Sequence, residues 1–272
     1  IIVDADLSNY EEVSALLTGS AIGIKGKIVE SGGKGQSIEM QATEVLIYGK
    51  SDDSYPLQKK GASLEFLREK AHLRARTNLF RAVFKVRHEL AQATHNFFSN
   101  QGFFYMNSPI ITGVDGEGAG EMFKVSTLDP KNPPKDDKGE IDYSKDYFGS
   151  DVSLCVTGQL EAECHAMGLG SVYTFGPTFR SENSNTKRHL SEFWMVEPEV
   201  AFADLEDVAD LAADYIKYMI DHALKTCEKE LNFIWGIPVS EVDKTHRNTL
   251  ELVRDSEFKR ITYTEAIDIL SR

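Results

Sequence analysis

Apolar and polar residues alternate in two stretches near the start of the chain. Residues 21–30 and 37–48 have this period of two, which is typical of strands with one buried face. Before them, residues 6–17 have the spacing of a short helix. The pattern in residues 1–50 therefore predicts a small β-rich unit, with too few strands to close a barrel by itself. A polar connector is expected at residues 51–70, with a helical stretch over residues 64–69.

A long amphipathic helix is expected from Thr77 onward, and Gly102 is suited to its end. Its apolar residues recur at intervals of three and four, so they lie on one face. This face consists of Leu79, Val83, Val86, Leu90, Ala93 and Phe97. A strand over residues 103–106 follows, and Pro109 stops it.

Three further strands are expected at residues 152–157, 172–180 and 193–202. Because loops would join these neighbouring strands, we expect an antiparallel sheet. Asp204 is expected to cap a second long helix. Its inward-facing residues would be Leu205, Val208, Leu211, Tyr215, Met219 and Ala223. The predicted fold class is α+β, with residues 71–272 forming a domain in which helices flank the sheet.

Composition and charge limit the function classes. The 272 residues are 41% hydrophobic, and no apolar run approaches the ~20 residues of a membrane span. The net charge of −13 argues against a nucleic-acid partner unless a local basic face exists. Residues 129–148 form a charged stretch that we interpret as a surface insertion. Three cysteines lack disulfide or zinc-ligand spacing, so we expect reduced thiols in a cytoplasmic protein.

The most informative stretch is a hairpin-like string around residue 180. A strand ends in Phe-Arg-x-Glu, a polar loop follows, and a strand resumes after Arg-His-Leu-x-Glu-Phe. A hairpin of this form brings together Arg180, Glu182, Arg188 and His189. The planar arginine fork suits phosphate, because it donates two parallel charge-assisted hydrogen bonds. An Arg-x-Glu alone is more often an exposed hairpin with ordinary surface charges.

The whole string from Phe179 to Phe193 resembles motif 2 of class II aminoacyl-tRNA synthetases, and the resemblance extends over nearly the full chain. It implies that Arg180 binds the ATP α-phosphate and the substrate carboxylate, with Glu182 at the adenine amino group or the tRNA end. Arg180 and Glu182 would be the catalytic residues. The resemblance further implies an ATP-binding set completed by Arg188 and His189 at the γ-phosphate, Phe193 stacked on adenine, and Leu190.

A second resemblance concerns the subclass. Residues 71–78, the long helix and Ser108-Pro109 resemble motif 1 of the aspartyl, asparaginyl and lysyl enzymes. This implies a homodimer with Arg76 and Pro109 at the interface. It also implies that residues 1–50 are part of an anticodon-binding OB-fold barrel. A simple amphipathic core helix fits the same periodicity.

The third resemblance concerns amino-acid specificity. Residues 115–123 resemble the flipping loop that closes over the bound amino acid, with Glu117 near the substrate's ammonium or amide; a Gly-rich surface turn is the alternative. The Gly-Glu-Met-Phe that ends this loop resembles the asparaginyl branch, where aspartyl enzymes usually carry Arg-Asp-Phe.

In residues 156–163 the substrate-binding lysine of aspartyl enzymes is absent. Ala162 matches it and Glu163 follows. A carboxylate repels aspartate and accepts hydrogen bonds from an amide NH₂. Gln159, Glu163 and Arg180 are therefore expected, with Glu117, to bind asparagine. Glu163 could instead be a structural acid at a helix start.

Motif 3 of the family, a Gly-rich segment ending in Glu-Arg, is not found. Gly236 is the only glycine in residues 203–272. We therefore expect the chain to be part of a longer enzyme, to contain no metal ligands, and to form little adenylate alone. The expected activity is ligation of asparagine to tRNA(Asn), with ATP and Mg²⁺. Alternatives are a tRNA-independent asparagine synthetase, an aspartyl or non-discriminating enzyme, and a non-enzymatic dimerisation or RNA-binding module.

Overall fold

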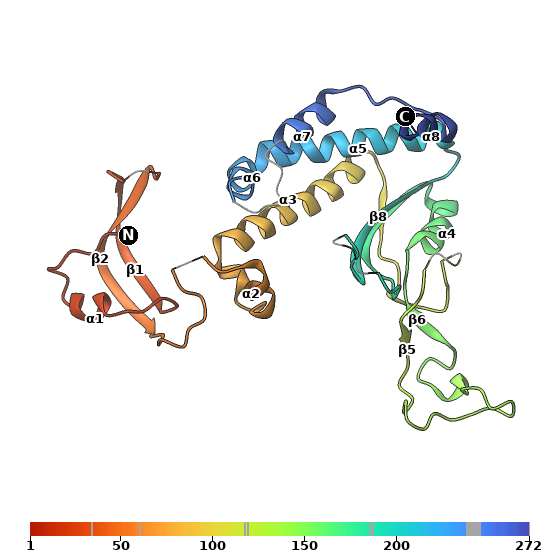
Figure 1. The fold of residues 1–272 in the computed structure, drawn as a ribbon, viewed down its shortest axis with the longest axis horizontal. Helices are drawn as coiled ribbons and strands as arrows, with labels where there is room; N and C mark the ends of the chain where they lie inside the picture. The colour runs from red at the N-terminus through yellow and green to blue at the C-terminus, as the bar shows by residue number, and fades with distance from the viewer. Residues whose placement is uncertain are drawn as a thin grey trace. The chain divides into compact units, whose positions relative to one another are not determined.

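The computed structural model describes residues 1–33, 35–59, 61–116, 118, 120–184, 186, 188–237 and 246–271 (Figure 1). The chain forms two compact units, Ile1–Arg81 and Ala82–Arg272. Each is described by itself below.

The first unit is built on one long antiparallel hairpin, β1 (Ala21–Glu30) with β2 (Ile38–Gly49). The alternation predicted both strands, and Val45 is buried. The helix expected over residues 6–17 is wrong in length, because α1 covers only Tyr10–Ser14. The Asn9 side chain does not cap α1 but donates to the carbonyl oxygen of Val45 (2.9 Å). Its bond to β2 competes with a longer helix.

Two short helical segments follow in this unit. Ser63 caps α2 (Leu64–Glu69) by accepting a hydrogen bond from the amide of Phe66, as expected for a serine at this position. The 3₁₀ helix η1 (Arg74–Arg76) leads to Thr77, whose hydroxyl accepts a bond from the amide of Phe80 (3.3 Å). Thr77 is therefore the start of the long helix, as predicted.

The second unit has its core between two long helices and a sheet. The helices are α3 (Asn78–Asn100) and α5 (Leu205–Thr226), and the hydroxyls of Thr94 and Tyr215 join them at 2.8 Å. Gly102 follows α3 with a φ of +82°, which favours glycine. The core contains Phe97, Phe98 and Tyr173, with Phe103, Phe175, Val196, Leu211, Tyr215 and Tyr218 packed against it.

The predicted inward faces of both helices are only partly buried. Val83 is 37% exposed on α3, and Leu205 and Val208 are 80% and 44% exposed on α5. The reason is that the main aromatic core cluster packs on the C-terminal half of α3 and the middle of α5. Periodicity defines an apolar face but not how far along the helix a neighbour covers it.

The sheet differs from the single antiparallel sheet that we expected. Its order is β3 (Phe104–Met106), β7 (Ser171–Phe179) and β8 (Glu192–Val200), and β3 runs parallel to β7. The cause is α4 (Gln159–Leu169), a helix that the sequence suggested only as an alternative role for Glu163. It packs on β7 through Ala162, Ala166 and Val172. A helical connection of this kind allows parallel pairing.

The strand expected at 152–157 is shorter and belongs to a second sheet. There, β6 (Val152–Leu154) lies between β4 (Ile111–Thr112) and β5 (Lys124–Val125). Cys155 joins the two sheets, since its carbonyl accepts from the amide of Phe179 (2.8 Å). The chain then turns into α4 beside the end of β7.

The charged insertion between β5 and β6 is ordered around Asp146. This carboxylate is 7% exposed and accepts hydrogen bonds from the hydroxyls of Ser126 and Thr127 and from the amides of Thr127 and Tyr147. The segment includes the 3₁₀ helix η2 (Tyr143–Lys145). The insertion is therefore closed at its base by one side chain.

The last part of the described chain is helical. It comprises α6 (Glu228–Trp235), α7 (His246–Asp255) and α8 (Tyr263–Leu270). Arg260 holds the segment before α8 against the start of α5, through Glu206 and Asp210. Within the described residues, no helix is long and apolar enough to cross a membrane.

Candidate active site

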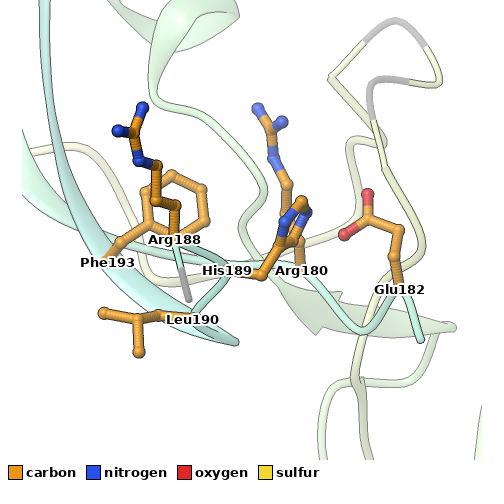
Figure 2. Close-up of a pocket in the computed structure, with 6 residues that line it drawn as sticks. All are labelled: Arg180, Glu182, Arg188, His189, Leu190 and Phe193. Carbon is orange, nitrogen blue, oxygen red and sulfur yellow. The ribbon is translucent and has the colours of Figure 1, made fainter. Parts of the chain in front are cut away.

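A pocket of about 260 Å³ opens at the end of the β7–β8 hairpin (Figure 2). Its lining residues are the six of the predicted ATP-binding set, Arg180, Glu182, Arg188, His189, Leu190 and Phe193. The hairpin register pairs Phe179 with Glu192, and the amide of Arg180 donates to the carbonyl of Ser191 (3.0 Å). The structure thus brings this whole predicted set together, because the pairing of β7 with β8 places residues 188–193 beside residues 180–182.

Arg180 is the half-buried cation of this pocket. Its guanidinium carbon lies 5.5 Å from the centroid of the Phe193 ring, and its Nη2 donates at a long 3.5 Å to the carbonyl of Val156. Its Nε is buried, and no hydrogen-bond partner for it lies among the described residues. An unsatisfied charged donor is costly, so an anionic acceptor placed at this Nε would stabilise the site.

The other pocket residues surround this cation. Figure 2 shows the guanidinium groups of Arg180 and Arg188 extending in the same direction, with the Glu182 carboxylate beyond Arg180. Arg188, His189 and Leu190 are exposed. The His189 ring contacts the hydroxyl of Thr186 (3.2 Å). Two arginine side chains and one aromatic ring around an open pocket fit a nucleoside triphosphate.

Of the residues expected to bind the amino acid, Arg180 lines the pocket, whereas Gln159 and Glu163 lie on α4 and are not among its lining residues. Gln159, in the first turn of α4, donates from Nε2 to Oε1 of Glu163 (2.9 Å). Gln159 is half-buried and Glu163 is exposed. Glu117 lies outside the described residues. The loop that contains it ends against the hairpin, since the amide of Ser181 donates to the carbonyl of Glu121 (2.8 Å).

Glu197 on β8 is a residue that the sequence reading missed. Its carboxylate accepts bonds from the hydroxyls of Thr157 and Thr174 (2.8 Å for Thr174) and from the amide of Gly158 (3.1 Å). It therefore holds the turn between β6 and α4. The signal in the sequence was a glutamate in the middle of a mostly apolar strand, and the structure pairs it with Thr174.

A second missed carboxylate, Glu199, lies two residues farther along β8. Burial raises its pKa, and the nearby charges of Glu163 and Glu197 raise it further. Glu199 therefore lies in the electrostatic field of the other two carboxylates. Such a field disfavours an anionic side chain nearby.

Comparison with known protein families shows which family this chain belongs to. Residues 63–271 match the family described as tRNA synthetases class II (D, K and N). The chain belongs to this family. This confirms the resemblance that motifs 1 and 2 indicated for a class II synthetase.

Relatives of the class II synthetase chain are asparagine–tRNA ligases. That of Cytophaga hutchinsonii is 53% identical over 271 residues, which are 99% of this chain and 58% of the relative. That of Porphyromonas gingivalis is 52% identical over 269 residues, 98% of this chain and 56% of the relative. These matches confirm the likeness to the asparaginyl branch. The chain spans somewhat more than half the length of these relatives.

Solved structures give the same relationship. The asparaginyl-tRNA synthetase from Pyrococcus horikoshii complexed with asparaginyl-adenylate has a TM-score of 0.79 and is 27% identical, covering 99% of this chain and 56% of that one. This likeness confirms the predicted fold class, a partial OB-fold followed by a class II core. The domain boundaries predicted at residues 50 and 70 stay predictions.

The two expected interface residues of this class II synthetase chain are both exposed. Arg76 belongs to the first unit, where its Nη1 donates to the hydroxyl of Tyr55 (3.0 Å). Pro109 lies in the second unit, between β3 and β4. Their place at a dimer interface stays a prediction.

Proposed function

We propose that this chain supplies the nucleotide-binding hairpin of an asparagine–tRNA ligase. The observation that carries the proposal is Arg180, a cation with a buried and unsatisfied Nε in a pocket lined by the whole predicted ATP-binding set. The family and the asparagine–tRNA ligase relatives support the same reaction. The substrates would be asparagine, ATP and tRNA(Asn).

The proposed reaction has two steps. The asparagine carboxylate attacks the α-phosphorus of ATP, and diphosphate leaves with the electrons of the broken phosphoanhydride bond. The terminal hydroxyl of tRNA then attacks the adenylate carbonyl, and AMP leaves. Arg180 would neutralise charge on the α-phosphate and the attacking carboxylate, which are held in line. Phe193 would hold adenine by stacking, worth roughly 1–3 kcal/mol.

Arg188, His189 and Glu182 would complete ATP binding. Arg188 and His189 would meet the outer phosphates, and Glu182, on the other side of Arg180, would accept a hydrogen bond from the adenine amino group or the tRNA end. Mg²⁺ is the cofactor that the family implies. Within the part of the chain that the structure describes, no group of three or more His, Cys, Asp or Glu side chains could hold a metal ion. We therefore assign Mg²⁺ no ligand and derive no step through it.

Selection of asparagine over aspartate would rest on charge. Gln159 and the carboxylates of Glu163, Glu197 and Glu199 present amide and anionic groups on α4 and β8. A second carboxylate in such a field is repelled, whereas an amide is accepted. An aspartyl or non-discriminating enzyme is the alternative. Competition of aspartate against asparagine in the activation assay separates the two.

A homodimer and a cytoplasmic location complete the proposal. The apolar face of α3 leaves Val83 37% exposed. Trp194 on β8 is 47% exposed, and Arg87 of α3 lies over its ring at 6.0 Å. Exposed apolar surface of this kind is typical of an interface. Sedimentation as a monomer at working concentrations would contradict the dimer. The cysteines are all unpaired, which suits a reducing compartment.

The decisive experiment is asparagine-dependent exchange of diphosphate into ATP by the protein in its complete natural length, followed by tRNA charging. Arg180→Ala should lower kcat/KM for activation at least ~10²-fold, as for loss of one transition-state donor. Arg254→Ala, at a half-buried arginine of α7 that is paired with Asp255, is the matched control and should exchange like the parent. A parent without asparagine-dependent exchange, or an Arg180→Ala variant with normal kinetics, would refute the proposal. Exchange without tRNA charging would indicate the tRNA-independent synthetase.

A further inference from the structure

The backbone of Gly120 lies against two pocket residues at once. A Cβ atom placed on Gly120 would come within 2.8 Å of Oε1 of Glu182 and within 3.2 and 3.3 Å of Cδ and Cγ of Arg180. Gly116 and Gly118 have positive φ angles, but Gly120 does not. Glycine is therefore needed at position 120 for space and not for backbone conformation.

Two backbone hydrogen bonds hold this close approach in place. The amide of Ser181, between Arg180 and Glu182, donates to the carbonyl of Glu121 (2.8 Å). The amide of Arg180 donates across the hairpin to the carbonyl of Ser191 (3.0 Å). The residue after Gly120 and the residue after Arg180 are thus joined directly. The backbones of Gly120 and Arg180 cannot move far apart without breaking one of these bonds.

This arrangement bounds the Arg180 side chain on several sides. Gly120 lies along its aliphatic stem, the Phe193 ring lies 5.5 Å from its guanidinium carbon, and the carbonyl of Val156 meets its Nη2. A methyl group at position 120 would displace the Glu182 carboxylate, which is the free end of a flexible side chain. It would also move the Arg180 stem by a few tenths of an ångström.

We propose that Gly120 is a positioning residue for ATP recognition, which sets the places of the Arg180 stem and the Glu182 carboxylate by leaving them room. This rests on the proposed function, in which both side chains contact ATP. The reaction rate falls steeply when a catalytic group is displaced, and a misplacement of about 1 Å can lower the rate about 10²-fold. A smaller displacement predicts a loss of about tenfold.

The test compares Gly120→Ala with Gly113→Ala in the exchange assay, using the protein in its complete natural length. Gly113 is a matched control, since its φ is not positive and the nearest atom to a Cβ there is the carbonyl oxygen of Asp151 at 3.9 Å. Gly120→Ala should raise the KM for ATP about tenfold, with a smaller change in the KM for asparagine. Gly113→Ala should match the parent, and both variants should unfold at the parent temperature. A Gly120→Ala variant with the parent KM for ATP would overturn the proposal.

A double variant separates the proposed contact from a general effect on the loop. In the Glu182→Ala background the nearest obstructing atom is gone, so Gly120→Ala should change the KM for ATP by a clearly smaller factor. An equal factor in both backgrounds would overturn the proposal. If Gly120→Ala alone fails to fold, folding of the double variant supports the contact and its failure overturns it. A parent without asparagine-dependent exchange refutes the proposed function instead.

Discussion

The Glu197 carboxylate should be the main polar support of the turn that leads into α4. It accepts hydrogen bonds from the hydroxyls of Thr157 and Thr174 and from the amide of Gly158. Thr157 and Thr174 are 9% and 2% exposed. Glu197→Ala would therefore leave three donors without their acceptor in a place where little water reaches them.

The size of the effect follows from these three bonds. A hydrogen bond to a charged group contributes about 1.5–3 kcal/mol, and an unsatisfied buried donor costs about 1–3 kcal/mol. The two hydroxyls can rotate toward other acceptors, but the amide of Gly158 cannot. We expect Glu197→Ala to lower the free energy of unfolding by about 3–5 kcal/mol. Glu197→Gln keeps one acceptor oxygen and should cost about 1 kcal/mol.

Tryptophan fluorescence during thermal unfolding of the 272-residue chain measures this effect. Both tryptophans, Trp194 and Trp235, lie in the second unit, so the signal reports on the unit that contains Glu197. For a unit of this size, 1 kcal/mol shifts Tm by about 2–4 °C. Glu197→Ala should therefore lower Tm by about 6–20 °C, and Glu197→Gln by about 2–4 °C.

Glu199→Gln is the matched control on the same strand. Burial and the charges of Glu163 and Glu197 raise the pKa of Glu199 in the folded state. Its ionised form therefore opposes folding at neutral pH, and the neutral amide should keep or raise Tm. A Glu197→Ala variant that unfolds within about 1 kcal/mol of the parent would refute the reasoning, because the donors would then have found other acceptors.

Two further predictions concern the insertion and α5. The hydrogen bonds from Ser126 and then Thr127 hold the pKa of Asp146 well below its usual range, so its stabilising effect should be complete above the unfolded pKa of about 3.9 and decline as pH falls below it. Asp146→Asn should increase proteolytic cleavage within residues 126–149 at neutral pH, and cleavage at the parent rate would contradict this. Asp204→Ala removes the capping box of α5 and should lower the free energy of unfolding by about 1 kcal/mol, measured by circular dichroism. An unchanged Tm would show that the cap is replaced by solvent.

Helices and strands with a strong hydrophobic periodicity were predictable from the sequence. Elements that depend on contacts between distant segments were not. The alternation over residues 21–30 predicted β1, and α2 has the bounds that were predicted for it. In contrast, the buried residues of α4 are two alanines, Ala162 and Ala166. Small side chains give a weak pattern in a sequence, although they allow a helix to pack closely on a strand. The parallel pairing of β3 with β7 followed from that helix and was missed with it.

The sequence by itself determined the pocket set, because all six residues belong to one hairpin whose two strands pair in a single register. It also determined the family, since the order of motifs 1 and 2 is a property of the chain alone. Only the tertiary structure decided that Gly120 and Val156 bound the Arg180 side chain and that Glu197 holds the turn before α4. The physical reason is that periodicity and capping act within a few residues, whereas these contacts depend on which distant segments the packed core brings together.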